Sequence, residues 1–496
     1  MKLSNQALLQ LPKEVIVPNY DRNQIKTKIV HLGFGAFHRA HQAVFTDILA
    51  AEHNSDWGYC EVNLMGGEKQ IADLKEQNYL FSVCEMSYDN WSTRVVGVVK
   101  EALHVDVDGI VKILDVMTHP QIAIISLTVT EKGYCYLPAT ASIDINNVLI
   151  KHDIDNPTNP KSAPGVIVEA LRIRKEKGLK PFTVMSCDNM PENGHVTRNV
   201  ILALAKIRDA NLTQWIEKNV SFPSTMVDRI VPAVTLDTMA KIQKQLGGIE
   251  DLVGIAGEPF IQWVIEDNFV AGRPEWEKSG AELVNDVFPY EEMKLRMLNG
   301  SHSFLAYLGY LAGYLHIDEC MQDPYYVKAA RHLILQEQAT TLRVKDIDLL
   351  AYANSLLDRY RNTGLKHRTW QIAMDGTLKL PQRMLDSVRF HLANNTPFHC
   401  LALGIAAWMR YVSGVDDNGK VIEVSDPAAE QLKALVSNSP DNQERIKALL
   451  SLTHVFGKDL SSNQYFIDQV TNAYLSLRDK GAKQTVEQLA QSFQYN

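Results

Sequence analysis

The sequence has few of the features that mark secreted, membrane-bound or nucleic-acid-binding proteins. Its six cysteines are spread over 496 residues without a C-x-x-C pair, which argues against a disulfide framework and a structural zinc site. The N-terminus lacks the apolar core of a signal peptide, and the longest apolar region, residues 304–315, is too short to span a bilayer. Without a dense Lys/Arg block, and with a formal net charge of −8, we expect no nucleic-acid partner. These absences predict a cytoplasmic protein without a membrane partner.

The length and the apolar patterning predict two domains of different class. A chain of 496 residues exceeds one ordinary hydrophobic core. Between residues 29 and 190, β-branched apolar runs alternate with amphipathic stretches, the pattern of a parallel sheet with crossover helices. The predicted strands are residues 29–32, 59–64, 122–129 and 182–186, and the predicted helices are 37–51, 162–177, 196–208 and 238–246. Residues 79–84 and 94–99 are predicted to form an antiparallel insertion.

Beyond residue 289 the pattern becomes helical with almost no strand-like alternation. The clearest helical stretches are residues 326–338, 346–359, 381–393, 428–435 and 463–480. We therefore expect an α/β domain over residues 1–288, followed by a mainly α-helical domain over residues 289–496.

A glycine-rich turn follows the first predicted strand. Residues 33–39 read Gly-Phe-Gly-Ala-Phe-His-Arg, and a strand that leads through Gly-x-Gly into a helix is typical of a pyrophosphate-binding turn. His38 replaces the third glycine of the dinucleotide motif, so an ordinary tight turn is the alternative. Arg39 would add a cationic contact to phosphate. Glu61 or Glu68 would bind the ribose hydroxyls and favour NAD.

Residues 294–302 place a lysine, an amide and an imidazole within apolar sequence. On an α-helix Lys294, Asn299 and His302 fall within an arc of about 140°, so their polar ends would reach one small ligand. These groups suit proton-coupled carbonyl chemistry. The alternative is a helix, broken at Gly300, that turns its polar side chains to solvent. A metal site at His38 and His41 lacks further ligands at suitable spacing, so we expect no metal.

Five stretches, residues 30–41, 126–134, 186–194, 226–232 and 294–302, resemble the polyol-specific long-chain dehydrogenases, the family of mannitol 2-dehydrogenase. The resemblance implies a Rossmann-type N-terminal domain, a helical C-terminal domain with the catalytic residues, and NAD as the cofactor. Residues 61–65, 259–269, 294–310 and 367–376 resemble most the fructuronate-reducing branch. That branch implies interconversion of D-mannonate and D-fructuronate.

The resemblance also implies roles for individual residues. Lys294 matches the catalytic base, Asn189 and Asn299 match the asparagines that hold the substrate oxygen, and His302 matches the adjacent histidine. Glu131 and Glu291 align with acidic residues near the lysine. The residues expected at the cofactor are Val30, Leu32, Gly33, Phe34, Gly35, Ala36, Phe37, His38, Arg39 and Glu131. For Lys294 to act near neutral pH, its pKa would have to fall from about 10.4 to about 7–8, which takes roughly 3–5 kcal/mol.

The sequence departs from the mannitol branch near Asp375. Gln371 stands where we expect an arginine, and Arg368 precedes it by three residues. A substrate carboxylate needs a cation, and Arg368 and Lys379 are the candidates, although both also suit ordinary salt bridges.

Other functions remain open at this point. A tagaturonate reductase and a mannitol or polyol dehydrogenase would share the same chemistry. A non-catalytic dinucleotide-binding regulator would have no use for Lys294, and a hydrolase using Glu258 and Glu266 would not explain the glycine-rich turn. The oligomeric state cannot be inferred from these patterns.

Overall fold

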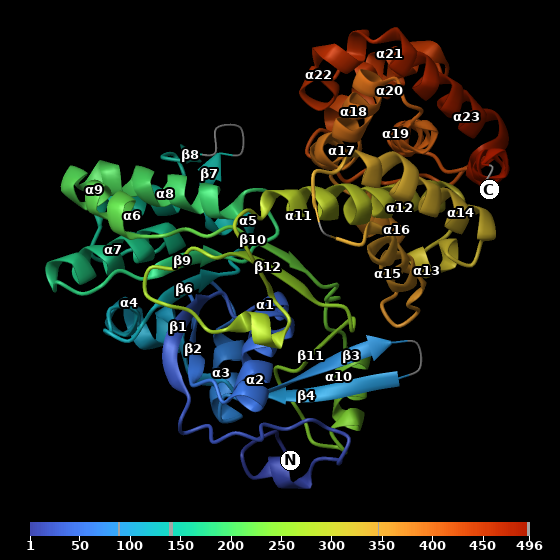
Figure 1. Cartoon of the computed structure of the whole chain (residues 1–496). Helices are drawn as coiled ribbons and strands as arrows, with labels where there is room; N and C mark the ends of the chain where they lie inside the picture. The colour runs from blue at the N-terminus through green and yellow to red at the C-terminus, as the bar shows by residue number, and fades with distance from the viewer. Residues whose placement is uncertain (88–89, 138–141, 346, 494–496) are drawn as a thin grey trace. The chain divides into compact units, whose positions relative to one another are not determined.

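The chain divides into two compact units. The computed structural model describes residues 1–87, 90–137, 142–345 and 347–493. The N-terminal unit spans Met1–Phe288 and the C-terminal unit spans Pro289–Asn496. In Figure 1 the N-terminal unit runs from blue to yellow-green and the C-terminal unit from yellow to red.

A five-stranded parallel sheet forms the centre of the N-terminal unit. Its strands are β1 (Lys26–Leu32), β2 (Trp57–Asn63), β5 (Val99–His104), β6 (Ile124–Leu127) and β9 (Thr183–Ser186). They lie in the order β5-β2-β1-β6-β9, and each neighbouring pair is parallel. This is the Rossmann-type order, so the predicted fold is confirmed. The order reverses between β1 and β6, and such sheets bind ligands at the carboxyl ends of the strands there.

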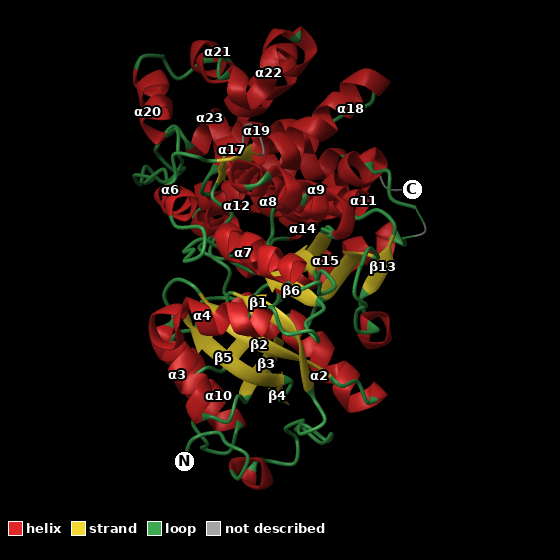
Figure 2. Cartoon of the chain, turned by 90° about the vertical axis from the view of Figure 1, so that its left-hand side faces the viewer, coloured by secondary structure: helices red, strands yellow, loops and turns green. Residues whose placement is uncertain are grey.

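Helices cover both faces of this sheet, which explains why its strands are apolar throughout (Figure 2). Ile29 packs in one core with α2 (Gln42–His53), whereas Val30 and Leu32 pack in the other with α4 (Val105–Met117), α7 (Ala163–Glu176) and α8 (Asn193–Arg208). Successive side chains of β1 thus enter opposite cores.

Smaller sheets and helices complete the N-terminal unit. One sheet joins β3 (Phe81–Ser87) antiparallel to β4 (Asn90–Val96) and parallel to β11 (Ile255–Gly257). A second contains β10 (Thr225–Asp228), β12 (Gln262–Glu266) and β13 (Glu282–Val284). The remaining elements are α1 (Ala36–Ala40), α3 (Glu68–Glu76), α5 (Thr130–Gly133), β7 (Tyr136–Leu137), β8 (Ser142–Ile143), α6 (Val148–Asp155), α9 (Ala210–Asn219), α10 (Leu236–Gln245) and two short 3-10 helices, Ala7–Gln10 and Trp276–Ser279.

Two predicted elements of this unit need correction. The predicted helix over residues 37–51 is two helices, because the backbone of His41 leaves helical geometry at φ −128° and ψ −90°. The predicted strand over residues 94–99 joins the end of β4 to the start of β5, and these strands belong to different sheets. The predicted antiparallel pair, β3 with β4, is confirmed.

The C-terminal unit is helical, as predicted. Its helices are α11 (Phe288–Met293), α12 (Ser301–Leu311), α13 (Ile317–Cys320), α14 (Pro324–His332), α15 (Leu349–Arg361), α16 (Thr369–Ala373), α17 (Gly376–Leu380), α18 (Asp386–Asn394), α19 (His399–Tyr411), α20 (Ala429–Ser437), α21 (Gln443–Leu450), α22 (Thr453–Ser462) and α23 (Gln464–Ser492). Helices α12 and α19 pack together and are buried over almost their full lengths. The helix predicted from residue 346 begins at Leu349, and Asp346 lies outside the described residues. Within the described part of the chain, no helix is long and apolar enough to cross a bilayer.

Three segments of this unit have π-helical geometry: Lys294–Gly300, Leu333–Gln338 and Pro381–Leu385. They meet at Gly300, where a β-carbon would overlap the side-chain amide of Gln338 and lie 2.6 Å from the carbonyl oxygen of Arg383. π-Helical turns are rare and are found frequently at functional sites.

Candidate active site

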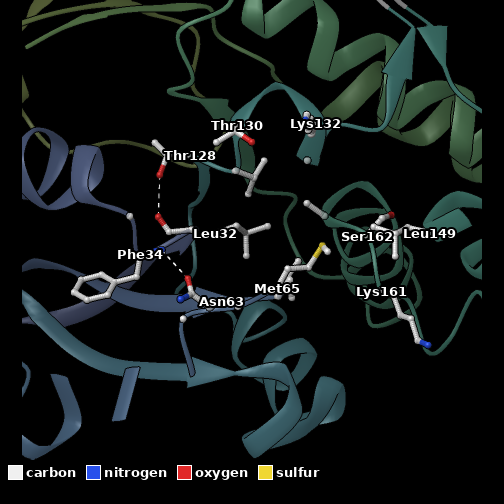
Figure 3. A pocket seen from close by; sticks show the side chains of 18 of the residues that line it. Leu32, Phe34, Asn63, Met65, Thr128, Thr130, Lys132, Leu149, Lys161 and Ser162 are labelled. Atoms are coloured by element: carbon white, nitrogen blue, oxygen red, sulfur yellow. Dashed lines mark hydrogen bonds between the residues drawn. The ribbon is translucent and has the colours of Figure 1, made fainter. Parts of the chain in front are cut away.

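The candidate cofactor site is a pocket of about 530 Å³ in the N-terminal unit (Figure 3). The carboxyl ends of three neighbouring strands form it, with residues 32–35 after β1, 63–67 after β2 and 128–130 after β6. Leu149, Lys161 and Ser162 lie together on the opposite side, and Lys132 lies next to Thr130. The pocket therefore lies where a Rossmann-type sheet binds a dinucleotide.

The glycine-rich turn is shaped by its contacts with the neighbouring strands. Gly33 has φ +105°, and a β-carbon there would overlap the carbonyl group of Thr128. The Thr128 hydroxyl donates a hydrogen bond to the Gly33 carbonyl oxygen at 2.9 Å, and the Phe34 amide donates one to the Asn63 side-chain oxygen at 2.8 Å (Figure 3). Glycine is needed at position 33 because an L side chain would strain the backbone and strike β6.

The structure brings four of the predicted cofactor residues to this pocket: Leu32, Gly33, Phe34 and Gly35. The others do not line it: Val30, Ala36, Phe37, His38, Arg39 and Glu131. Val30 is buried in the sheet, and Glu131 is exposed and accepts a hydrogen bond from the Tyr136 hydroxyl at 3.0 Å. The phenyl ring of Phe34 points away from the pocket, so Phe34 contributes its backbone.

The placement of Arg39 speaks against the predicted phosphate contact. Its guanidinium donates to the carbonyl oxygens of Gly35, at 3.1 Å, and Val253. Burial is the main cause that lowers its pKa to about 10. Since α1 turns this side chain into the core, phosphate would be held by backbone groups of the turn instead.

His38 and Glu61 also point into the core rather than to the pocket. The His38 ring stacks on the His31 ring with 3.5 Å between centroids and bonds to the Glu61 carboxyl at 2.9 Å. Burial lowers the pKa of His38 to about 3 and raises that of Glu61 to about 7. The expectation that Glu61 binds ribose is therefore corrected, because its side chain lies on the far side of β2. Glu68 begins α3 and is exposed, without lining the pocket.

Among the described residues, His31, His38 and Glu61 form the group whose ligating atoms lie close enough together to hold a metal ion, within 4.8 Å of one another. Both nitrogens of His31 are already hydrogen-bonded, to Ser126 and to Thr128, each at 2.8 Å. Because imidazole lone pairs lie in the ring plane, two rings stacked at 14° do not aim them at one ion. The arrangement fits a buried hydrogen-bond network better than a metal site.

A loop after β9 carries Asn189 and is tied to the pocket by its neighbour. The Asp188 carboxylate accepts hydrogen bonds from the amides of Val129 and Thr130, at 3.0 and 2.9 Å, and from the Tyr134 hydroxyl at 2.7 Å. Asn189 itself is exposed in the following bend. Asp188 is not among the residues predicted from the sequence, although its position two residues after the end of β9 is the signal that marks it.

In the C-terminal unit, Lys294, Asn299 and His302 lie on one continuous helical segment. Gly300 does not break it, and its backbone stays helical at φ −67°. Lys294 and His302 are buried and Asn299 is partly exposed, so the alternative of a helix that turns these side chains to solvent does not hold. The expected α-helical arc needs correction, because the π turn closes over five residues and so brings Lys294 and Asn299 closer to one face.

Aromatic side chains fix this segment. The Tyr360 hydroxyl donates to the Leu298 carbonyl oxygen at 2.8 Å, and the Ser301 hydroxyl donates to the Met297 carbonyl oxygen at 2.5 Å. The Tyr360 ring stacks on His302 with 5.1 Å between centroids, and the His367 ring meets His302 edge-on at 4.7 Å. His302 is therefore held in one orientation.

The electrostatics make His302 a neutral group at neutral pH. Burial, followed by the nearby His367, Arg383, Arg359 and Lys379, lowers the pKa of His302 well below its usual value. Burial lowers the pKa of His367 to about 4. A neutral His302 exchanges hydrogen bonds with a ligand but does not supply a proton as an imidazolium.

The two residues predicted to bind a carboxylate lie in different settings. The Lys379 ammonium donates to the carbonyl oxygens of Met374, at 2.6 Å, and Ile372, at 3.4 Å. Arg368 is exposed, with extended backbone at φ −77° and ψ 129°. Lys379 is among the cations that act on the pKa of His302, and Arg368 is not.

Comparison with known proteins identifies the family. The model of the mannitol dehydrogenase Rossmann domain matches residues 27–278, and that of the mannitol dehydrogenase C-terminal domain matches residues 286–478. The chain belongs to the mannitol dehydrogenase family. The Rossmann-domain match includes the glycine-rich turn, and the C-terminal-domain match includes the Lys294 segment.

Relatives within the mannitol dehydrogenase family cover nearly the whole chain. The chain is 62% identical to the uncharacterized oxidoreductase YdfI of Escherichia coli (strain K12) over 476 residues, which cover 96% of this chain and 98% of YdfI. It is 55% identical to the D-mannonate oxidoreductase of the same organism over 475 residues, covering 95% and 97%. The structure of Pseudomonas fluorescens mannitol 2-dehydrogenase in ternary complex with NAD and D-mannitol is 38% identical, has a TM-score of 0.85, and covers 99% of this chain and 100% of that one.

Proposed function

We propose that this oxidoreductase interconverts D-mannonate and D-fructuronate with NAD. The observation that carries the proposal is the 55% identity to D-mannonate oxidoreductase across nearly the full length of both chains. The greater identity to the uncharacterized YdfI makes a different sugar acid the main competitor. Tagaturonate and neutral polyols are therefore the substrates to compare.

The residues of the N-terminal unit fit a dinucleotide. Gly35 lines the pocket with open space around its α-carbon, so a ligand can approach its backbone closely, and residues 63–67 at the end of β2 carry no charge. Lys69, the first cation after β2, is paired with Asp73 at 2.5 Å, and Glu68 precedes it. An uncharged strand end followed by an acidic residue favours NAD over NADP, whose extra phosphate would need a cation. When bound, NAD accepts hydride from the alcohol, and NADH donates it to the ketone.

The residues of the C-terminal unit supply the proton chemistry. In oxidation, Lys294 as the neutral amine would take the proton from the C5 hydroxyl of mannonate, and in reduction its ammonium form would return it. The amides of Asn299 and Asn189 would donate hydrogen bonds to the same oxygen while it carries negative charge. His302, neutral and fixed against Tyr360, would add a hydrogen bond without competing for the proton.

The decisive experiment follows NADH consumption with fructuronate, tagaturonate and fructose in parallel. We expect kcat/KM to be highest with fructuronate and NADH to bind more tightly than NADPH. If kcat/KM is highest with tagaturonate or with fructose, that compound replaces fructuronate as the assigned substrate. No turnover with any of the three would instead favour a non-catalytic dinucleotide-binding protein.

A further inference from the structure

Arg383 lies beside the candidate catalytic residues of the C-terminal unit. It belongs to the π turn Pro381–Leu385, and its Nη1 donates to the Ser303 hydroxyl at 3.0 Å and to the Asn299 carbonyl oxygen at 3.4 Å. Its charge also acts on His302. The guanidinium is thus anchored, through one nitrogen, to the helical segment that carries Asn299 and His302.

The opposite edge of this guanidinium lacks a partner. Both hydrogen bonds involve Nη1, whereas Nε is buried and has no hydrogen-bond partner among the described residues. Nε and Nη2 form one edge of the planar group, the arrangement that binds a carboxylate through two parallel hydrogen bonds. The side chain as a whole is partly exposed, whereas Nε is shielded from solvent, so a ligand held at this edge would be held away from water.

The Arg383 guanidinium has no ion-pair partner among the described residues, and burial lowers its pKa to about 10. Its charge acts on the neighbouring Lys379, whose pKa is lowered to about 8, chiefly by burial. Asp375 is 3.9 Å from the Lys379 ammonium, and Asp426 accepts hydrogen bonds from the amide and hydroxyl of Thr377. Asp375 acts on both cations and Asp426 acts on Lys379, but neither carboxylate forms an ion pair with Arg383, so its guanidinium remains open to an anionic ligand.

We propose that Arg383 binds the carboxylate of a sugar-acid substrate through its Nε and Nη2 atoms. The inference rests on the proposed function and assigns the specificity for sugar acids over neutral sugars to this residue. It replaces Arg368, whose side chain is exposed and which is not among the cations that act on His302. Lys379 adds positive charge while its ammonium holds the carbonyl groups of residues 372 and 374.

The test compares kcat/KM for fructuronate with kcat/KM for fructose in the wild type and in Arg383→Gln, Arg383→Lys and Arg368→Gln. We expect the ratio to fall about 100-fold in Arg383→Gln, mainly through KM, because a hydrogen-bonded charge pair is lost. Arg383→Lys should give an intermediate ratio, since an ammonium lacks the two-point fork. Arg368→Gln should stay within about threefold of the wild type, as its side chain carries no such contact. An unchanged ratio in Arg383→Gln, or a collapse in Arg368→Gln, would overturn the proposal.

Failure of the substrate assignment would look different. If the wild type prefers tagaturonate, the proposed reaction is wrong, and the ratio of tagaturonate to its neutral ketose then tests Arg383 in the same way. A wild type without preference for any sugar acid would overturn both proposals. Thermal melting of each variant checks folding. If Arg383→Gln fails to fold, Arg383→Lys takes its place: weaker protection against melting by mannonate than in the wild type supports the proposal, and equal protection overturns it.

Discussion

Gly33 lies so close to Thr128 that a β-carbon on the glycine would overlap the threonine carbonyl group. The contact joins the turn after β1 to the end of β6, the two strands between which the sheet order reverses. It fixes the backbone on which dinucleotide binding is proposed to depend.

Gly33→Ala should therefore weaken both the fold and cofactor binding. The substitution places a side chain at φ +105° and pushes β1 and β6 apart, so we expect a lower melting temperature and at least tenfold weaker NADH binding. Gly35→Ala is the matched control, because Gly35 has φ −86° and its β-carbon would meet only the Gly33 carbonyl oxygen, at 3.8 Å. It should retain the melting temperature and weaken binding alone. Equal melting losses in both variants would contradict this account.

Lys294→Met should abolish turnover and leave cofactor binding intact. Methionine keeps an unbranched side chain in this buried position and removes the amine, so packing is largely retained. We expect kcat to fall at least 1,000-fold, as for loss of a general base. Lys433→Met, at an exposed position of α20, should leave kcat unchanged. Near-normal turnover in Lys294→Met, measured by NADH consumption, would remove Lys294 from the mechanism.

Gly300→Ala should disturb the junction of the three π turns. Its β-carbon would overlap the Gln338 amide and crowd the Arg383 carbonyl oxygen, so we expect a loss of about 1–3 kcal/mol in the free energy of unfolding. Because Asn299 is the adjacent residue, kcat should fall as well. The double variant Gly300→Ala with Gln338→Ala should recover part of the stability in denaturant titrations, since the flexible side chain is removed and only the backbone crowding remains. Strictly additive losses would show that the two residues do not compete for space.

The parallel sheet could be predicted because its strands are buried on both faces and so carry continuous apolar runs, as at residues 29–32. The boundary between β4 and β5 could not be predicted, because only Gly97 and Val98 separate the two strands and the apolar run continues through both residues. The break at His41 is hidden for a similar reason: the apolar spacing continues through α1 and α2.

In the candidate site, too, apolar patterning reveals some side chains but not the contacts between them. Lys294, Asn299 and His302 stand out as polar residues in an apolar segment, but the π turn that relates them leaves no trace in apolar spacing. Arg383 follows Pro-Gln in a segment that reads as an ordinary helix surface, and its role depends on Ser303 and Asn299, some 80 residues earlier. The sequence does not reveal that Glu61 pairs with His38 rather than facing the pocket, because the two residues come together only when β2 pairs with β1.

Glu61→Gln should change how stability depends on pH. The folded pKa of Glu61, about 7, lies above the unfolded value of 4.5, so the folded state binds the extra proton between these values. The stability from this group is complete below about pH 4.5 and is lost as the pH rises through about 7. Glutamine has no such proton, so the melting temperature of Glu61→Gln minus that of the wild type should rise between about pH 5 and pH 7 and level off above the folded pKa. His31 and His38 have lowered pKa values and give the opposite slope in both proteins, so the difference isolates Glu61. A difference that stays constant over this range would mean that Glu61 is already ionised in the folded protein at pH 5.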